Sequence, residues 1–125
     1  MVDLAGYVSV DLYEVEKRIN ELLQGVDRGD YIAVLEIWER YLAEKLTFPF
    51  KAEVAESDDG CGPLGVGDLL NVKKIEYADD KYGILVEVRH GRKKYFYPLC
   101  DLEVVDKKSA NHEPVQDYVI YFSNR

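Results

Sequence analysis

Apolar residues recur every three or four positions along the first third of the chain, the spacing of helices with one buried face. One such stripe fills residues 11–24, where Asp11 is placed to cap the helix start and Gly25 can end it. A second stripe fills residues 30–46. Pro49 disfavours helical geometry at the residue before it, Phe48, so this helix should end near residue 46. The pattern therefore predicts two helices, packed as an antiparallel pair against the apolar core of the later part of the chain.

Beyond this point the helical spacing gives way to the alternation that is typical of strands. In the first alternating stretch, Phe48–Glu56, the apolar side chains can point inward while Glu53 points out at the surface. His90-Gly91 indicates a tight hairpin, and Pro98 is expected to bend the last strand, because proline cannot donate to a sheet ladder. The predicted strands cover residues 48–56, 68–77, 82–89 and 93–104.

A third helix is expected near the end of the chain, at residues 114–123, where Pro114 suits the first helical position and one face is apolar. The fold class is therefore α+β: an N-terminal helix pair, a bent four-stranded antiparallel sheet or small Tudor-like barrel within residues 48–106, and a C-terminal helix. With 125 residues the chain is expected to form a single domain over residues 1–125.

The charge balance narrows the classes of partner. There are 24 acidic against 16 basic residues, a formal net charge of −8, which repels phosphate backbones and attracts cations. No apolar run is long enough to span a bilayer, and residues 1–10 lack the features of a signal peptide. We expect a cytoplasmic monomer that binds neither nucleic acid nor membrane.

Nucleophiles and acid–base groups are sparse. Cys61 and Cys100 are too few for a disulfide framework and lack zinc-ligand spacing, so reduced thiols are favoured over a structural bridge. Cys100 is expected to pack into the core with a raised pKa. His90 lies at a turn and His112 in a polar loop, without a nucleophile motif beside them. We expect no enzymatic activity.

Two motifs have a structural explanation that is favoured over a functional one. Residues 60–65 satisfy G-x-G-x-x-G, but they contain Pro63 and precede a strand instead of opening a helix, so a dinucleotide site is not expected. The basic run at residues 89–94 falls on a predicted hairpin tip, where charged side chains more often protect a sheet edge than bind phosphate.

The acidic residues are the strongest chemical signal. Calcium takes six to eight oxygen ligands, but Asp58-Asp59-Gly60 lacks the pattern of an EF-hand loop, so a site would have to combine separate strands and turns. Pairing of the first and last strands would place like charges side by side, and a divalent cation would relieve their repulsion. Composition alone favours a solvated acidic face. The acids are Glu53, Glu56, Asp58, Asp59, Asp79, Asp80, Asp101 and Glu103.

Several segments carry a family resemblance, which spans roughly residues 38–125. They are Trp38–Leu42, Leu46–Val54, Asp79–Gly83, Pro98–Val104, Asp117-Tyr118 and Phe122–Arg125. These segments resemble the small acidic calcium-binding proteins of the CcbP type, described from cyanobacteria. The resemblance implies a bacterial signalling protein that binds Ca²⁺ at an acidic surface, as a buffer or a sensor.

The resemblance also orders the candidate calcium ligands. Asp79, Asp80 and Asp101 come first, because they lie inside the matching segments. Lys51 lies close to the candidate ligands of the first strand, where its positive charge could weaken a site. The remaining candidates are Glu53, Glu56 and Glu103.

Aromatic residues leave a second function open. Four tyrosines fall on or beside the predicted strands, where they could form a cage for cations or peptide side chains, or pack as core residues with a hydroxyl in solvent. The core interpretation is favoured. The alternative function is a protein interaction module whose acidic surface binds a basic peptide. The tyrosines are Tyr77, Tyr82, Tyr95 and Tyr97.

Overall fold

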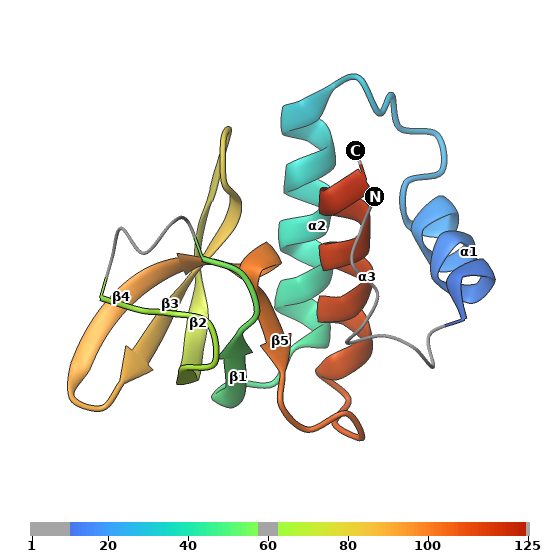
Figure 1. The fold of residues 1–125 in the computed structure, drawn as a ribbon. Helices are drawn as coiled ribbons and strands as arrows, with labels where there is room; N and C mark the ends of the chain where they lie inside the picture. The colour runs from blue at the N-terminus through green and yellow to red at the C-terminus, as the bar shows by residue number, and fades with distance from the viewer. Residues whose placement is uncertain (1–10, 58–62, 125) are drawn as a thin grey trace.

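The computed structural model describes residues 11–57 and 63–124. One face of an antiparallel sheet lies against α2 and α3, and α1 lies on the side of α3 that is turned away from the sheet (Figure 1). The elements in chain order are α1 (Leu12–Leu22), α2 (Tyr31–Lys45), β1 (Phe50–Val54), β2 (Leu69–Asp79), β3 (Gly83–His90), β4 (Lys93–Pro98), the short 3₁₀ turn η2 (Leu99–Asp101), β5 (Leu102–Val104) and α3 (His112–Asn124).

The helices begin and end within two residues of the predicted positions. The Asp11 side chain accepts hydrogen bonds from two N–H groups of the first turn of α1. The Asp30 side chain caps α2 by accepting one hydrogen bond, from the N–H of Ala33 at 3.2 Å. Pro114 lies inside the first turn of α3. Backbone N–H groups in the first turn have no partner within the helix, so the missing N–H of proline costs no hydrogen bond there. Within the described residues, none of the helices combines the length and apolar character needed to cross a bilayer.

The predicted four-stranded sheet needs correction, because the described residues form five strands in the order β4-β3-β2-β1-β5. Pro98 ends β4 and the η2 turn follows, so the predicted last strand breaks in two. Its second part, β5, crosses the sheet to pair with β1. Since β4 and β5 lie at opposite edges, the described ladder stays open and does not close into a Tudor-like barrel.

The predicted helix pair on the sheet also needs correction, because α1 packs against α3. An ion pair joins these two helices: Arg18 donates to the Asp117 carboxylate from Nε at 2.7 Å and from Nη2 at 2.9 Å. Asp117 is only 1% exposed. Burial raises the pKa of Asp117, and the hydrogen bonds and charge of Arg18 oppose that rise.

The core lies between the sheet and the layer of α2 and α3. Trp38 of α2 and Tyr118 of α3 are almost fully buried and meet edge to face, with ring centroids 5.4 Å apart. The backbone N–H of Ile84 in β3 donates to the Tyr118 hydroxyl at 2.9 Å. This bond fixes the start of β3 against α3, and with it the turn that leads out of β2.

Candidate metal-binding site

Asp79 is the last residue of β2 and holds the turn after this strand. Its Oδ1 accepts hydrogen bonds from the backbone N–H groups of Lys81 at 2.8 Å and Tyr82 at 2.9 Å. These two bonds hold the pKa of Asp79 below its usual value, and the bond from Tyr82 has the larger effect. The side chain is therefore an anion throughout the physiological pH range.

Asp101 forms a corner between the η2 turn and β5. Its carbonyl oxygen accepts hydrogen bonds from the backbone N–H groups of Ala55 at 2.8 Å and Glu56 at 3.2 Å. The corner thus holds the acidic end of β1 against the start of β5. Two of the predicted ligand residues, Glu56 and Asp101, are neighbours for this reason.

The Cys100 thiol lies beside the negative charges at this corner. Its pKa is raised to about 12, first by burial and then by the charge of Asp101. A hydrogen bond from Sγ to Asp101 Oδ1 at 3.6 Å and the charge of Glu56 add to the rise. The raised pKa agrees with the prediction for Cys100. Cys61 lies outside the described residues.

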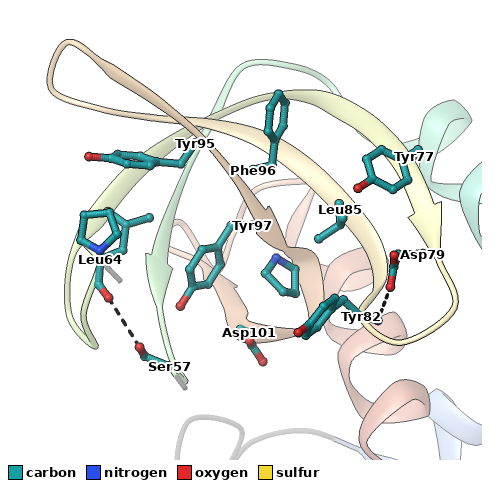
Figure 2. Close-up of a pocket in the computed structure, with 12 residues that line it drawn as sticks. Ser57, Leu64, Tyr77, Asp79, Tyr82, Leu85, Tyr95, Phe96, Tyr97 and Asp101 are labelled. Carbon is teal, nitrogen blue, oxygen red and sulfur yellow. Dashed lines mark hydrogen bonds between the residues drawn. The ribbon is translucent and has the colours of Figure 1, made fainter. Parts of the chain in front are cut away.

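Asp79 and Asp101 line the same cavity, which has a volume of about 420 Å³ (Figure 2). Glu56 adjoins it, because the neighbouring Ser57 lines the cavity and the hydroxyl of lining residue Tyr97 donates to the Glu56 carbonyl at 3.1 Å. The other lining residues are Pro63, Leu64, Tyr77, Tyr82, Leu85, Tyr95, Phe96 and Pro98.

The other predicted ligands lie outside this cavity. Glu53 of β1 and Glu103 of β5 occupy directly opposed positions of an antiparallel ladder, so two like charges share one face. Lys51 lies two residues before Glu53 on the same exposed face. Asp80 is exposed in the β2–β3 turn and is not among the residues that line the cavity.

Within residues 11–57 and 63–124, no group of three or more acidic, histidine or cysteine side chains is close enough together to hold a metal ion. Asp58 and Asp59 lie outside the described residues, as does the first part of the glycine motif of residues 60–65. The donors that line the cavity are carboxylate, hydroxyl and carbonyl oxygens, which suit a hard cation such as Ca²⁺. Two or three carboxylates with water can complete such a shell.

The tyrosines are only partly explained as core residues. Tyr95 and Tyr97 pack against the core cluster, but Tyr77 and Tyr82 are 49% and 41% exposed, and all four line the cavity. Sequence reasoning missed Phe96, which lines the cavity and is 50% exposed. The signal was present in the unbroken aromatic run Tyr95-Phe96-Tyr97.

The histidines and the basic run lie away from the cavity lining. His90 Nδ1 lies 3.1 Å from the Leu69 carbonyl oxygen, at the end of β3, and His112 begins α3. Residues 89–94 form the β3–β4 hairpin, at the edge of the sheet, as expected.

Comparisons with known proteins agree with this fold. The family model of the CcbP proteins, described as calcium binding, matches residues 17–122, so the match reaches further toward the N-terminus than the resemblance did and includes most of α1. No curated protein sequence matches significantly.

Two solved structures are similar. The crystal structure of Anabaena CcbP has a TM-score of 0.70 and 22% identity, over 94% of each chain. A calcium-binding protein in its calcium-binding form has a TM-score of 0.62 and 21% identity, over 94% of this chain and 95% of the other. The chain belongs to the CcbP family of calcium-binding proteins.

Proposed function

We propose that this protein binds Ca²⁺ reversibly and without an EF-hand, through the carboxylates of Asp79, Asp101 and Glu56 at the cavity. The main support for the proposal is that two anionic side chains line the same cavity although they come from β2 and η2, two segments that do not pair with each other. The ion known for the family is calcium, and the oxygen donors here match its preference. The role needs no catalysis.

The donor set favours calcium over magnesium. Magnesium demands a tight octahedron and keeps much of its water, whereas calcium accepts six to eight oxygens in irregular geometry. Ligands that come from three separate segments, the end of β1, the β2–β3 turn and η2, suit the more tolerant ion. Asp80, exposed in the same turn as Asp79, adds to the negative potential at this end of the sheet.

A sensor role is consistent with the same spacing. The proposed ligands lie on the β1–β5 side and on the β2–β3 turn, so an ion shared between them would draw these segments toward one another. Calcium binding would then change the shape of the cavity. A buffer is the alternative, and it would hold calcium without that change.

The opposed pair Glu53 and Glu103 is a second, weaker candidate locus. A cation between these carboxylates would relieve their repulsion. Lys51 on the same face opposes cation binding there. We therefore rank this pair below the cavity.

Calorimetric titration of chelator-stripped protein with CaCl₂, repeated in excess MgCl₂, tests the proposal. We expect saturable binding that survives magnesium and is weakened about tenfold or more in Asp101→Asn. Glu36→Gln on the exposed face of α2 is the matched control, since it removes one charge elsewhere. Absent heat together with an unmoved melting temperature would refute calcium binding.

Nuclear magnetic resonance separates sensor from buffer. Backbone amide shifts of Ala55, Tyr82 and Leu102 are expected to move together on calcium addition, because each residue lies in or directly beside one of the three segments that the ion would connect. Binding by calorimetry with shifts confined to the ligand residues would favour a buffer.

A further inference from the structure

The cavity has an aromatic wall that calcium binding does not explain. Five rings line it, together with the carboxylates of Asp79 and Asp101 (Figure 2). Calcium binds oxygen atoms and gains nothing from an aromatic face. The faces of these rings carry partial negative charge and attract organic cations. The rings belong to Tyr77, Tyr82, Tyr95, Phe96 and Tyr97.

Three of these rings are costly to leave in water. Tyr77, Tyr82 and Phe96 are 49%, 41% and 50% exposed, although large aromatic side chains are normally buried. Exposed aromatic residues grouped around a cavity are typical of recognition sites, where tyrosine in particular is enriched.

The chain's own lysines already use two of the rings. The Lys81 ammonium lies 5.2 Å from the centroid of the Tyr82 ring, and the Lys94 ammonium lies 5.8 Å from that of Phe96. Both distances fall within the range of cation–π attraction. Neither lysine lines the cavity, so these pairs show that the two rings attract alkylammonium groups and leave the cavity itself to an external one.

Carboxylates inside the same cavity supply the opposite charge. Asp79 lines the cavity, and both hydrogen bonds that define its turn use the same carboxylate oxygen, Oδ1. Asp101 lies elsewhere on the lining. With a net charge of −8, the whole molecule also attracts basic partners from a distance.

We propose that this cavity binds the side chain of a lysine presented by a partner protein. The rings contact its methylene chain and ammonium group, and Asp79 and Asp101 supply the counter-charge. A lysine suits the cavity better than a purely apolar side chain, because its ammonium group brings a positive charge to the two carboxylates that line the cavity, whereas a neutral side chain brings none. This makes the protein an acidic receptor for a basic partner as well as a calcium binder.

One consequence depends on the proposed function. If calcium also uses Asp79 and Asp101, the ion and the lysine compete for the same two carboxylates. Calcium would then release a basic partner, because each ligand lowers the affinity for the other by the same factor.

The test is a titration of ¹⁵N-labelled, chelator-stripped protein with N-acetyl-lysine-N′-methylamide, followed by amide shifts. N-acetyl-norleucine-N′-methylamide has the same backbone and a neutral, apolar side chain, so it is the matched control ligand. We expect saturable shifts at Tyr82, Leu85 and Phe96, and binding at least about fivefold weaker for the norleucine compound. Equal binding of the two ligands would overturn the proposal, as would shifts scattered over the acidic surface.

Two variants test the aromatic contribution. Phe96→Leu is expected to weaken lysine binding at least about threefold, and Tyr77→Leu serves the same purpose if the first variant fails to fold. Tyr13→Leu is the control, because this ring on α1 is 73% exposed and lies outside the cavity. Unchanged affinity in both cavity variants would overturn the site.

Repeating the lysine titration in saturating calcium separates the two proposals. Weaker lysine binding supports the shared carboxylates. Undiminished lysine binding would overturn the competition and place calcium outside the cavity, while the lysine site would stand on its own titration. A protein that binds calcium but not lysine would retain the proposed function and lose only the present inference.

Discussion

The Asp79 carboxylate accepts a hydrogen bond of 2.9 Å from the backbone N–H of Tyr82, so a side chain that lines the cavity also builds the turn beside it. The same oxygen accepts the N–H of Lys81. An asparagine side-chain oxygen can accept both bonds, although without the charge that strengthens them, so the geometry of the turn and the charge can be separated by substitution.

Replacing both turn acids, Asp79→Asn with Asp80→Asn, should weaken calcium binding about tenfold or more, because a charged ligand is lost. Stability in chelator should change little, as is usual for surface changes that keep their hydrogen bonds. Calorimetry and thermal unfolding measure the two effects. Asp80→Asn alone is the control and should have a smaller effect. Unchanged affinity in the double variant would move the site to the strand carboxylates.

Glu53→Gln should stabilise the calcium-free protein by about 0.5 kcal/mol, because it removes the repulsion from Glu103 directly opposite on β5. Glu103→Gln should give a similar gain. The double variant should gain little more than either single one, since one neutralisation already abolishes the repulsion. Denaturant unfolding in chelator measures all three. Fully additive gains would show that the two carboxylates do not interact.

Gly83→Ala should destabilise the fold by about 2 to 4 kcal/mol. Gly83 has φ 72°, and an added Cβ would collide with the Tyr118 hydroxyl and the Phe122 ring. Gly91→Ala is the matched control: its φ of 62° is also left-handed, but its Cβ would meet open space, so only about 1 kcal/mol should be lost. Equal losses in urea unfolding would mean that the collision is relieved without cost.

Arg18→Met should cost about 3 kcal/mol, the lower end for a broken buried ion pair, since the Arg18 side chain remains 30% exposed while Asp117 is buried. The variant leaves the Asp117 carboxylate without its charged partner. Adding Asp117→Asn to Arg18→Met should recover part of the loss, because the buried charge is then removed. No recovery in chemical unfolding would indicate that packing of the arginine chain dominates.

The Cys100 thiol gives a pH dependence. Its pKa is about 12 in the folded protein and about 8.5 in an unfolded chain, so the folded state keeps its proton longer. The corresponding stability is fully present below about pH 8.5 and is lost as pH rises toward 12. Unfolding of the parent chain and of Cys100→Ala, compared at pH 7 and pH 10, should show a larger loss for the parent. Parallel losses would contradict the raised pKa.

The elements that sequence reasoning located well depend on neighbours in the chain. Asp11 and Asp30 cap helices by bonding N–H groups two or three residues ahead, and a proline after α2 ends helical geometry there. Such interactions join residues that are close together in the sequence. They are therefore visible without knowledge of the fold.

The sheet topology could not be read in the same way. Pro98 gave a local signal for a bend, but the pairing of β5 with β1 depends on competition between strands far apart in the chain. Likewise, α1 packs against α3, where Arg18 pairs with Asp117, and no local pattern connects two residues almost a hundred positions apart.

The candidate site was foreseeable in part. The opposition of Glu53 and Glu103 is a consequence of pairing between the first and last strands, which the alternating pattern of both strands allows. The meeting of Asp79 and Asp101 at one cavity was not foreseeable, because their segments do not pair.

The position of α3 bears on how the chain reaches this fold during synthesis. The last helix in the sequence contacts α1, α2, η2 and β5, so it connects parts made much earlier. While residues 112–124 are still inside the ribosome, Arg18 has no acidic partner at Asp117, and the core face of α2 lacks the ring of Tyr118. The nascent chain can form local helices and hairpins, but it must wait for residues 112–124 before the layers join.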